Sequence, residues 1–181
     1  MTAAHPGHSV LQVPVPPLEA WVRARTAHYD RDYVSRDPSF THAHVTALGP
    51  FVDRLDDTTS AAVAAVAAQV QPFDFTLSRL DTFPNGIIHL LPEPDAGFAR
   101  LTSLLMAAFP DHPPYGGDFT PVPHLTLDLR HGDVTETSTR ELLGTVVPVR
   151  SRAEWLDLAW YEAGACHLLH RWPLGTPTVT P

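Results

Sequence analysis

The same short pattern, a histidine, one aliphatic residue and a threonine, occurs in two apolar segments of this chain. It reads "HVT" at residues 44–46, within "THAHVTAL", and "HLT" at residues 124–126, within "PVPHLTLDL". Short segments rich in aliphatic and β-branched residues, bounded by Gly or Pro, are typical of β-strands. Two equivalent strands, separated by about half of the chain, predict a duplicated fold.

The spacing of apolar residues predicts the elements around this repeated pattern. Strands are expected over residues 9–15, 41–48, 73–83, 87–91, 124–129, 152–162 and 166–174, and helices over residues 17–30, 56–70, 92–109 and 135–147. Hairpins alternate with helical connections in this order, which favours an α+β fold over a parallel doubly wound sheet. We therefore predict an α+β fold of two similar halves, each contributing one strand with the repeated pattern.

Length and composition predict a single globular domain. The chain has 181 residues, of which 44% are hydrophobic and 18% charged, enough apolar material to bury a core. We expect one domain over residues 1–181, present as a monomer, with residues 175–181 as a frayed tail. The single cysteine, Cys166, leaves no internal disulfide and is expected to be a small buried side chain.

We expect no secretory signal peptide and little electrostatic attraction for nucleic acid. The first residues lack a charged n-region and a long apolar h-region, and the run "AAVAAVAA" is too short to span a bilayer. We expect a cytoplasmic protein that does not contact membranes. The net charge of −8 argues against binding of extended duplex nucleic acid, but allows a small phosphorylated ligand held by a few local groups.

The repeated pattern carries a chemistry of its own. Residues i and i+2 of a strand point to the same face, so His44 projects with Thr46, and His124 with Thr126. An imidazole exchanges protons near neutral pH, and a hydroxyl can donate to a phosphoryl oxygen. Two such strands side by side would place a base and an acid across a phosphate, as an in-line displacement at phosphorus needs. The alternative is two ordinary strands with polar residues at sheet edges.

The two segments together resemble a known family. "HVTALGPF" and "PHLTL" are similar to the two signature motifs of the 2H phosphoesterase superfamily, especially its bacterial 2'-5' RNA ligase-like members. The opening "VLQVPVP", the segment "FPDHPPYGGDFTPVPHLTL" and "HRWPLG" near the end extend the resemblance over nearly the whole chain. The resemblance implies a two-lobed α+β fold, in which antiparallel sheets form a central groove and helices cover the outer faces.

The resemblance also implies an activity. It is the metal-independent hydrolysis of cyclic phosphodiesters, often 2',3'-cyclic phosphates at RNA ends or on nucleotides, and some members join RNA ends by the reverse reaction. On this sequence, His44 and His124 become the catalytic acid–base pair, and Thr46 and Thr126 the phosphate-binding hydroxyls. The implied product is a 2'-phosphomonoester, and no cofactor is required. Which histidine is the acid and which the base stays open.

Side chains beside the motifs are further candidates for substrate binding. Tyr115 and Phe119 lie in the glycine-rich loop before the second motif and could stack on a base, with Tyr115 the stronger candidate. Asp128 and Arg130 are expected to continue the face of Thr126 along "HLTLDLR". Arg130 could contact a ligand phosphate, or pair with an acid near the end of the strand.

Two other interpretations remain open. His42, His44 and Asp128 could hold Zn or Mn in a metal-dependent hydrolase, because imidazole and carboxylate suit these metals; otherwise His42 lines the groove or lies at the surface. The same groove could also belong to a non-catalytic nucleotide- or RNA-binding module. Members of the resembled family that handle RNA chains commonly carry basic residues around the groove, whereas this sequence is acidic, which favours a small cyclic nucleotide or a short RNA end over a long RNA chain.

Overall fold

The computed structural model of the chain describes residues 6–117 and 120–175. Its strands are β1 (His8–Pro14), β2 (His44–Leu48), β3 (Phe73–Thr82), β4 (Ile87–Glu93), β5 (Leu125–Leu129), β6 (Val149–Ala153), β7 (Trp155–Tyr161) and β8 (His167–Pro173). Its helices are α1 (Glu19–Tyr29), α2 (Asp57–Ala67), α3 (Ala96–Ala108) and α4 (Glu136–Leu143), with short 3-10 turns η1 (Pro16–Leu18), η2 (Arg31–Tyr33) and η3 (Pro114–Gly117). Each predicted strand and helix is present, with shifted ends.

Three differences from the predicted elements have local causes. The strand β6 is absent from the prediction, because its sequence, "VRSRA", is short and carries two arginines. The helix α3 begins at Ala96 rather than at residue 92, since Pro92 and Glu93 still pair with β3. The helix α4 ends at Leu143, before Gly144, whose φ of 50° and ψ of −117° are a non-helical conformation that glycine adopts readily.

The strands form two four-stranded antiparallel sheets with corresponding orders. One sheet runs β2-β1-β7-β8 and the other runs β5-β4-β3-β6. The two strands with the repeated pattern, β2 and β5, are therefore the edge strands of their sheets, and they contact each other. The sheets thus meet along these two strands, which confirms the predicted α+β fold with duplicated, antiparallel sheets.

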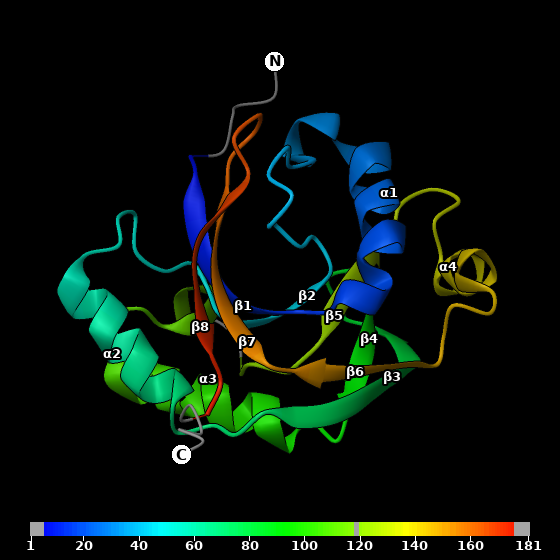
Figure 1. The fold of residues 1–181 in the computed structure, drawn as a ribbon. Coiled ribbons are helices and arrows are strands. Elements are labelled where there is room, and N and C mark those ends of the chain that lie inside the picture. The colour runs from blue at the N-terminus through cyan, green and yellow to red at the C-terminus, as the bar shows by residue number, and fades with distance from the viewer. Residues whose placement is uncertain (1–5, 118–119, 176–181) are drawn as a thin grey trace.

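The helices lie on the outside of this pair of sheets. Figure 1 shows α2 and α3 together below one sheet, and α1 and α4 beside the other. The contacts agree: α3 packs on β2 and α2 on β8, whereas α1 packs on β5 and α4 on β3. Two of these helices cross over, because α1 follows β1 but packs on β5, and α3 follows β4 but packs on β2, so the two halves are interlocked.

One continuous apolar core joins the sheets to the helices. It contains fully buried leucines from both sheets, such as Leu11, Leu77, Leu90 and Leu125. Phe51, which follows the first motif, is part of this core. Burying each such side chain contributes about 1.5–3 kcal/mol to folding.

A smaller cluster covers the other face of the β2-β1-β7-β8 sheet. It consists of Phe40, Ala159 and Cys166, with Tyr33 and Tyr161 packed against it. Cys166 is buried, as predicted, and burial raises the pKa of its thiol. The segment between α1 and β2 is therefore held over this sheet next to β2.

Both motif strands contain an irregularity directly after the motif threonine. Thr46 pairs with Gln12, and the next pair along is Leu48 with Leu11, so one residue of β2 is left without a partner. In β5 the same shift follows Thr126, which pairs with His89. The extra residue of such a bulge shifts the alternation of side chains between the two faces of the sheet. In each motif strand, the threonine is therefore the last residue of the regular alternation that begins at the histidine.

Two expectations concern the membrane and the chain end. None of the helices in residues 6–117 and 120–175 is long and apolar enough to cross a membrane. The backbone N–H of Gly175 donates to the carbonyl of Ala67 (3.0 Å), so the first residue of the predicted frayed tail is attached to α2. Residues 176–181 lie outside the described residues.

Candidate functional site

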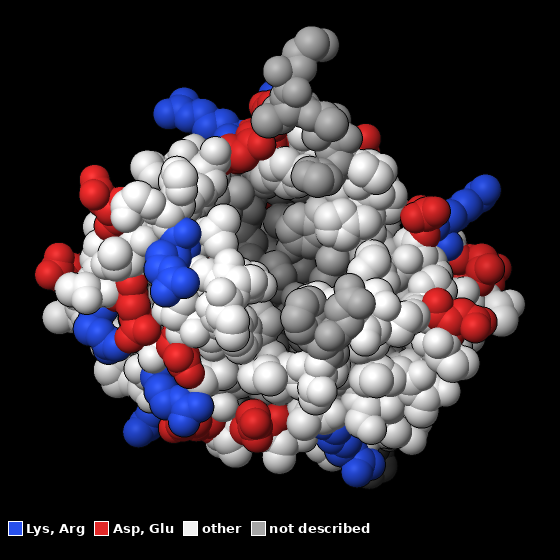
Figure 2. All heavy atoms as spheres, turned by 180° about the vertical axis from the view of Figure 1, so that it is seen from behind, with Lys and Arg blue, Asp and Glu red and all other residues white. Residues whose placement is uncertain are grey.

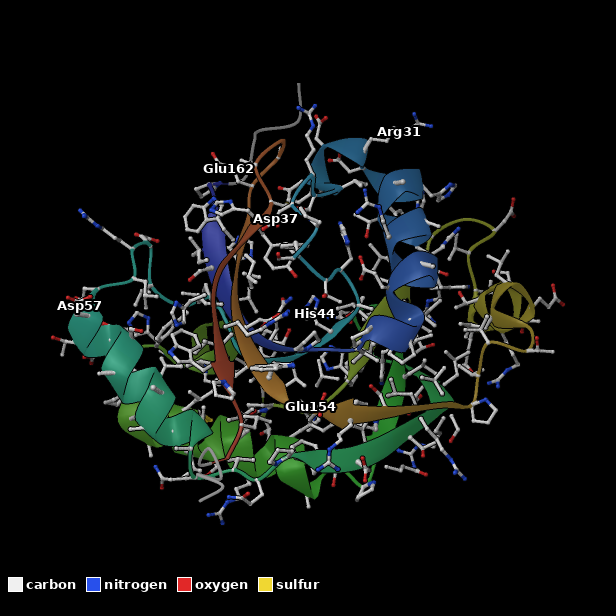
Figure 3. The ribbon with its side chains drawn as sticks, in the orientation of Figure 1. Arg31, Asp37, His44, Asp57, Glu154 and Glu162 are labelled. Carbon is white, nitrogen blue, oxygen red and sulfur yellow. The ribbon has the colours of Figure 1, made fainter. Side chains whose placement is uncertain are left out.

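The contact between β2 and β5 brings the two halves of the repeated pattern together. His44 begins β2, and His124 lies immediately before β5. Figure 3 shows His44 near the centre of the molecule, between the two sheets. Seen from the opposite side in Figure 2, the molecule is hollowed near its centre, and charged side chains lie mainly around this hollow rather than in its visible wall.

The two motif histidines are held in the same way. His44 Nδ1 lies 2.8 Å from the carbonyl oxygen of His42, and His124 Nδ1 lies 2.7 Å from that of Val122. A carbonyl only accepts, so in each ring Nδ1 carries the proton and donates it. Nε2 is then the atom free to exchange a proton with a ligand. The two half-sites therefore present one proton-exchanging nitrogen each.

Behind His44, a carboxylate fixes the segment that supplies this carbonyl. The Glu19 carboxylate of α1 accepts from His42 Nδ1 (2.6 Å) and from the backbone N–H of Ala43 (2.9 Å). His42 Nε2 accepts from the backbone N–H of Ser35 (3.1 Å). His42 is thus buried with both ring nitrogens engaged, and the expectation that it lines the groove or the surface is wrong.

Two residues beside His44 had no place in the sequence-based site. Gln12 of β1, fully buried next to Thr46, donates from Nε2 to the carbonyl of Thr41 (3.1 Å). The Tyr161 hydroxyl donates to Gln12 Oε1 (2.6 Å), and its oxygen lies 3.2 Å from His44 Nδ1. A glutamine inside the apolar run "SVLQVPV" was the available signal for Gln12, since a buried amide needs partners. Tyr161 comes from the far end of the chain and offered none.

The electrostatics keep both imidazoles neutral in the free protein. Burial lowers the pKa of His44 to about 4, with the neighbouring His124 as a further cause. Burial also lowers the pKa of His124, and the nearby His89 adds to this effect. At neutral pH each motif ring can therefore accept a proton, and an anionic ligand between them would favour protonation of one.

Comparison with known proteins identifies the family of this chain. The family model of the 2'-5' RNA ligase superfamily matches residues 13–165. The chain belongs to the 2'-5' RNA ligase superfamily. This assignment, within the 2H phosphoesterases, confirms the family inferred from the two motifs. No curated protein matches the chain.

Solved structures of this superfamily's fold overlay nearly the whole chain. The structure of E. coli LigT complexed with 3'-AMP has a TM-score of 0.58 at 17% identity, covering 95% of this chain and 100% of that one. LigT complexed with ATP has a TM-score of 0.53 at 18% identity, covering 95% and 100%. The structure of a Thermus thermophilus protein has a TM-score of 0.57 at 18% identity, covering 94% and 99%. At such identities the likeness establishes the fold.

Asp128 lies on the wrong side of β5 to join the site of this 2'-5' RNA ligase superfamily member. The bulge after Thr126 pairs Asp128 with Ile88, on the core face of the sheet. Its buried carboxylate accepts from Arg25 Nε (2.8 Å), from the Tyr29 hydroxyl (2.7 Å) and from the Thr139 hydroxyl (2.6 Å). The expectation that Asp128 continues the face of Thr126 is therefore wrong, and Asp128 instead ties β5 to α1 and α4.

Two of the three residues proposed as metal ligands are already engaged by other side chains or by the backbone. Of the three, Asp128 is committed to Arg25 on the core face, and the ring nitrogens of His42 are engaged by Glu19 and Ser35. Among the described residues, no group of three or more His, Cys, Asp or Glu side chains is arranged to hold a metal ion. These three residues do not form a metal site.

The three residues predicted to bind substrate, Tyr115, Arg130 and Phe119, differ in where the structure places them. Tyr115 lies in η3 with a φ of 51°, the only non-glycine residue with positive φ in the described chain, and its backbone N–H donates to the carbonyl of Gly49 (3.0 Å). Strained backbone of this kind is often found at functional sites, and the bond joins the loop before the second motif to the segment after the first. Arg130 is exposed beyond the bulge, where its backbone N–H donates to Gly86 (2.8 Å). Phe119 lies outside the described residues.

The lowered pKa of His44 predicts a pH-dependent stability. In the folded protein this pKa is about 4, against 6.5 for a free histidine. Between these values the unfolded chain binds a proton that the folded ring does not, so stability is complete above pH 6.5 and falls as the pH drops towards 4. We expect this group to contribute a loss of about 2 kcal/mol over that range, discounted for its partial exposure.

The measurement is urea unfolding between pH 4 and 7. The difference between wild type and His44→Ala should shrink as the pH falls, because the alanine variant lacks this proton linkage. His167→Ala serves as a control, because His167 is exposed and its Nδ1 also bonds a carbonyl two residues earlier (Ala165, 2.7 Å). A pH-independent difference for His44→Ala would contradict the lowered pKa.

Proposed function

We propose that this protein hydrolyses 2',3'-cyclic phosphates, at RNA ends or on nucleotides, to 2'-phosphomonoesters by metal-independent two-histidine catalysis. One observation carries the proposal: two equivalent edge strands, each with one half-buried imidazole at its start held through Nδ1, meet along β2 and β5. Proton transfer on both sides of a phosphate needs two such nitrogens. We infer that His44, Thr46, His124 and Thr126 form the catalytic group.

The proposed reaction is an in-line displacement. Nε2 of one histidine takes a proton from water as the water oxygen forms a bond to phosphorus. The bond from phosphorus to the ribose 3' oxygen breaks, and the other histidine, protonated on Nε2, gives its proton to that oxygen. The hydroxyls of Thr46 and Thr126 donate hydrogen bonds to the non-bridging oxygens, where negative charge builds up. The 2'-phosphomonoester leaves, and a proton passes back to restore the pair.

The charge of the molecule favours a small substrate. With a net charge of −8 and charged side chains mainly around the hollow, the visible face of the described residues carries no extended basic path for an RNA chain. We propose that Tyr115 stacks on the base next to the reacting phosphate. Arg130 is proposed to contact a second phosphate only where the ligand extends beyond β5. LigT structures hold 3'-AMP, ATP and NADP+, which supports a nucleotide ligand here.

The test is hydrolysis of 2',3'-cyclic nucleotides and of a short RNA ending in a 2',3'-cyclic phosphate. We expect turnover to a 2'-phosphate that persists in excess chelator, with product identity read by phosphorus NMR. The reverse joining of RNA ends is measured with the same protein, using a 2',3'-cyclic phosphate end and a 5'-hydroxyl end. Binding without turnover would instead support the non-catalytic nucleotide-binding module, and loss of turnover in chelator would overturn the metal-independent mechanism.

A further inference from the structure

His89 occupies the position in the second half-site that Gln12 occupies in the first. Each is a buried polar residue on the second strand of its sheet, and each pairs across the sheet with the motif threonine, Gln12 with Thr46 and His89 with Thr126. Side chains paired in this way share a face and lie next to each other. His89 therefore belongs to the floor of the groove beside the second motif.

The ring of His89 is held in a cluster of three rings. Phe83 stacks on it with centroids 3.7 Å apart and planes at 20°. The plane of His124 is steeply inclined to both rings, at 90° to Phe83 with centroids 4.8 Å apart and at 70° to His89 with centroids 5.3 Å apart. Because His124 precedes β5 and is outside its ladder, these rings and the bond to Val122 are what hold its imidazole. His44, by contrast, lies within β2.

One ring nitrogen of His89, Nε2, makes no hydrogen bond in the free protein. Its Nδ1 lies 3.1 Å from the carbonyl of Ile87, so in the neutral ring Nε2 carries a lone pair. His89 Nε2 is the only buried side-chain nitrogen or oxygen of the described residues that lacks a hydrogen-bond partner. A buried acceptor left unpaired costs about 1–3 kcal/mol, so this nitrogen does not stabilise the fold. Gln12, at the equivalent position, has both of its polar atoms paired with Thr41 and Tyr161.

We propose that His89 is a positioning residue for His124, fixing the orientation of that imidazole and limiting its protonation, so that the two motif histidines act in different roles. The inference rests on the proposed function. The groups that face His89 are His124 from the loop, Thr126 from β5 and Asp81, its exposed register partner on β3. Two imidazoles this close cannot both become charged without cost. His89 therefore opposes protonation of His124, and no such imidazole stands beside His44 at the position of Gln12.

Two variants separate the two parts of this role. His89→Gln places there the residue found at the equivalent position of the other half, removing both the ring and the second titrating group. His89→Phe keeps a planar ring beside Phe83 and His124 but cannot bind a proton. His167→Ala is the control, because that exposed histidine has the same Nδ1 bond to a carbonyl and lies at the start of β8.

The first measurement is the NMR titration of His124, assigned through His124→Ala, in the protein without substrate. We expect the titration midpoint of His124 to rise by about 0.5–1 pH unit in His89→Gln, with that of His44 and all midpoints in the control unchanged. The second is the rate on 2',3'-cyclic nucleotide across pH. Here His89→Gln should lose about tenfold in maximal rate through misorientation, His89→Phe should retain most of it, and one limb of the profile should move in His89→Gln.

The outcomes distinguish the two proposals. If wild type does not turn over the substrate, the proposed function fails, while a raised midpoint of His124 still supports the role of His89. If the midpoint and the profile of His89→Gln match those of wild type, the role of His89 is overturned even when catalysis is confirmed. Should His89→Gln not fold, His89→Phe still removes the second titrating group, and a His124 midpoint equal to that of wild type in this variant overturns the role of His89 equally.

Discussion

Replacing either motif histidine by alanine is expected to lower kcat on a 2',3'-cyclic nucleotide by about 10²–10⁴-fold, the usual contribution of one positioned acid or base. His44→Ala and His124→Ala each remove one of the two Nε2 atoms that the carbonyls of His42 and Val122 leave free. The structure gives His44 no substitute, because Gln12 and Tyr161 beside it are engaged with each other. The measurement is kcat and KM from initial rates with fully folded variants.

The two losses should not multiply in the double variant. Groups that act in one proton-transfer step are strongly non-additive, so the double variant should be about as slow as the slower single variant. Each single variant should also lose one limb of the bell-shaped pH profile, which assigns the base and the acid. The exposed His167→Ala is the control and should keep the rate of wild type. Losses below about threefold in both single variants would leave the two strands as ordinary sheet edges.

The paired motifs and the fold were within reach of the sequence for a simple reason. Apolar periodicity reports local structure directly, so each predicted strand and helix was found, and the i, i+2 rule places His44 with Thr46 before any irregularity intervenes. The repeat of the pattern then indicated two halves, and the resemblance to a family indicated that they meet. In the structure the two halves meet where the edge strands β2 and β5 contact each other.

The surroundings of the motifs depended on contacts that no local pattern reports. A bulge adds one residue and reverses the faces, so Asp128 turns to the core although its spacing from Thr126 suggests the groove. His42 is buried by Glu19 of α1 and Ser35 of the connecting segment, neither of which the spacing of H-x-H indicates. Tyr161 reaches His44 from the far end of the chain. Long-range side-chain partners of this kind remain invisible to periodicity.

Asp128→Ala is expected to lower the free energy of unfolding by about 3–5 kcal/mol, the cost of breaking a buried ion pair by removing one partner. The Asp128 carboxylate is wholly buried and lies 2.7 Å from Arg25 Nη2, whose side chain is only 16% exposed. Without it the Arg25 guanidinium and the hydroxyls of Tyr29 and Thr139 lose their shared acceptor. The measurement is urea unfolding at constant pH.

A matched control comes from a second Arg–Asp pair on the surface. Asp74 and Arg152 lie 3.0 Å apart with side chains 78% and 48% exposed, so Asp74→Ala should change stability by less than about 0.5 kcal/mol. A cost for Asp128→Ala as small as that of the control would contradict the structural role derived from its contacts.

The Asp128→Ala variant also separates the structural role of Asp128 from a role as a metal ligand. A metal ligand would lose activity with little change in stability, and added Zn or Mn would alter the remaining rate. Because Asp128 joins β5 to α1 and α4 from the core face, we expect the reverse: a large loss of stability, and under conditions where the variant is folded, a rate that Zn or Mn does not restore. Asp128 then serves the site by holding the edge strand that carries Thr126, two residues away, against α1 and α4.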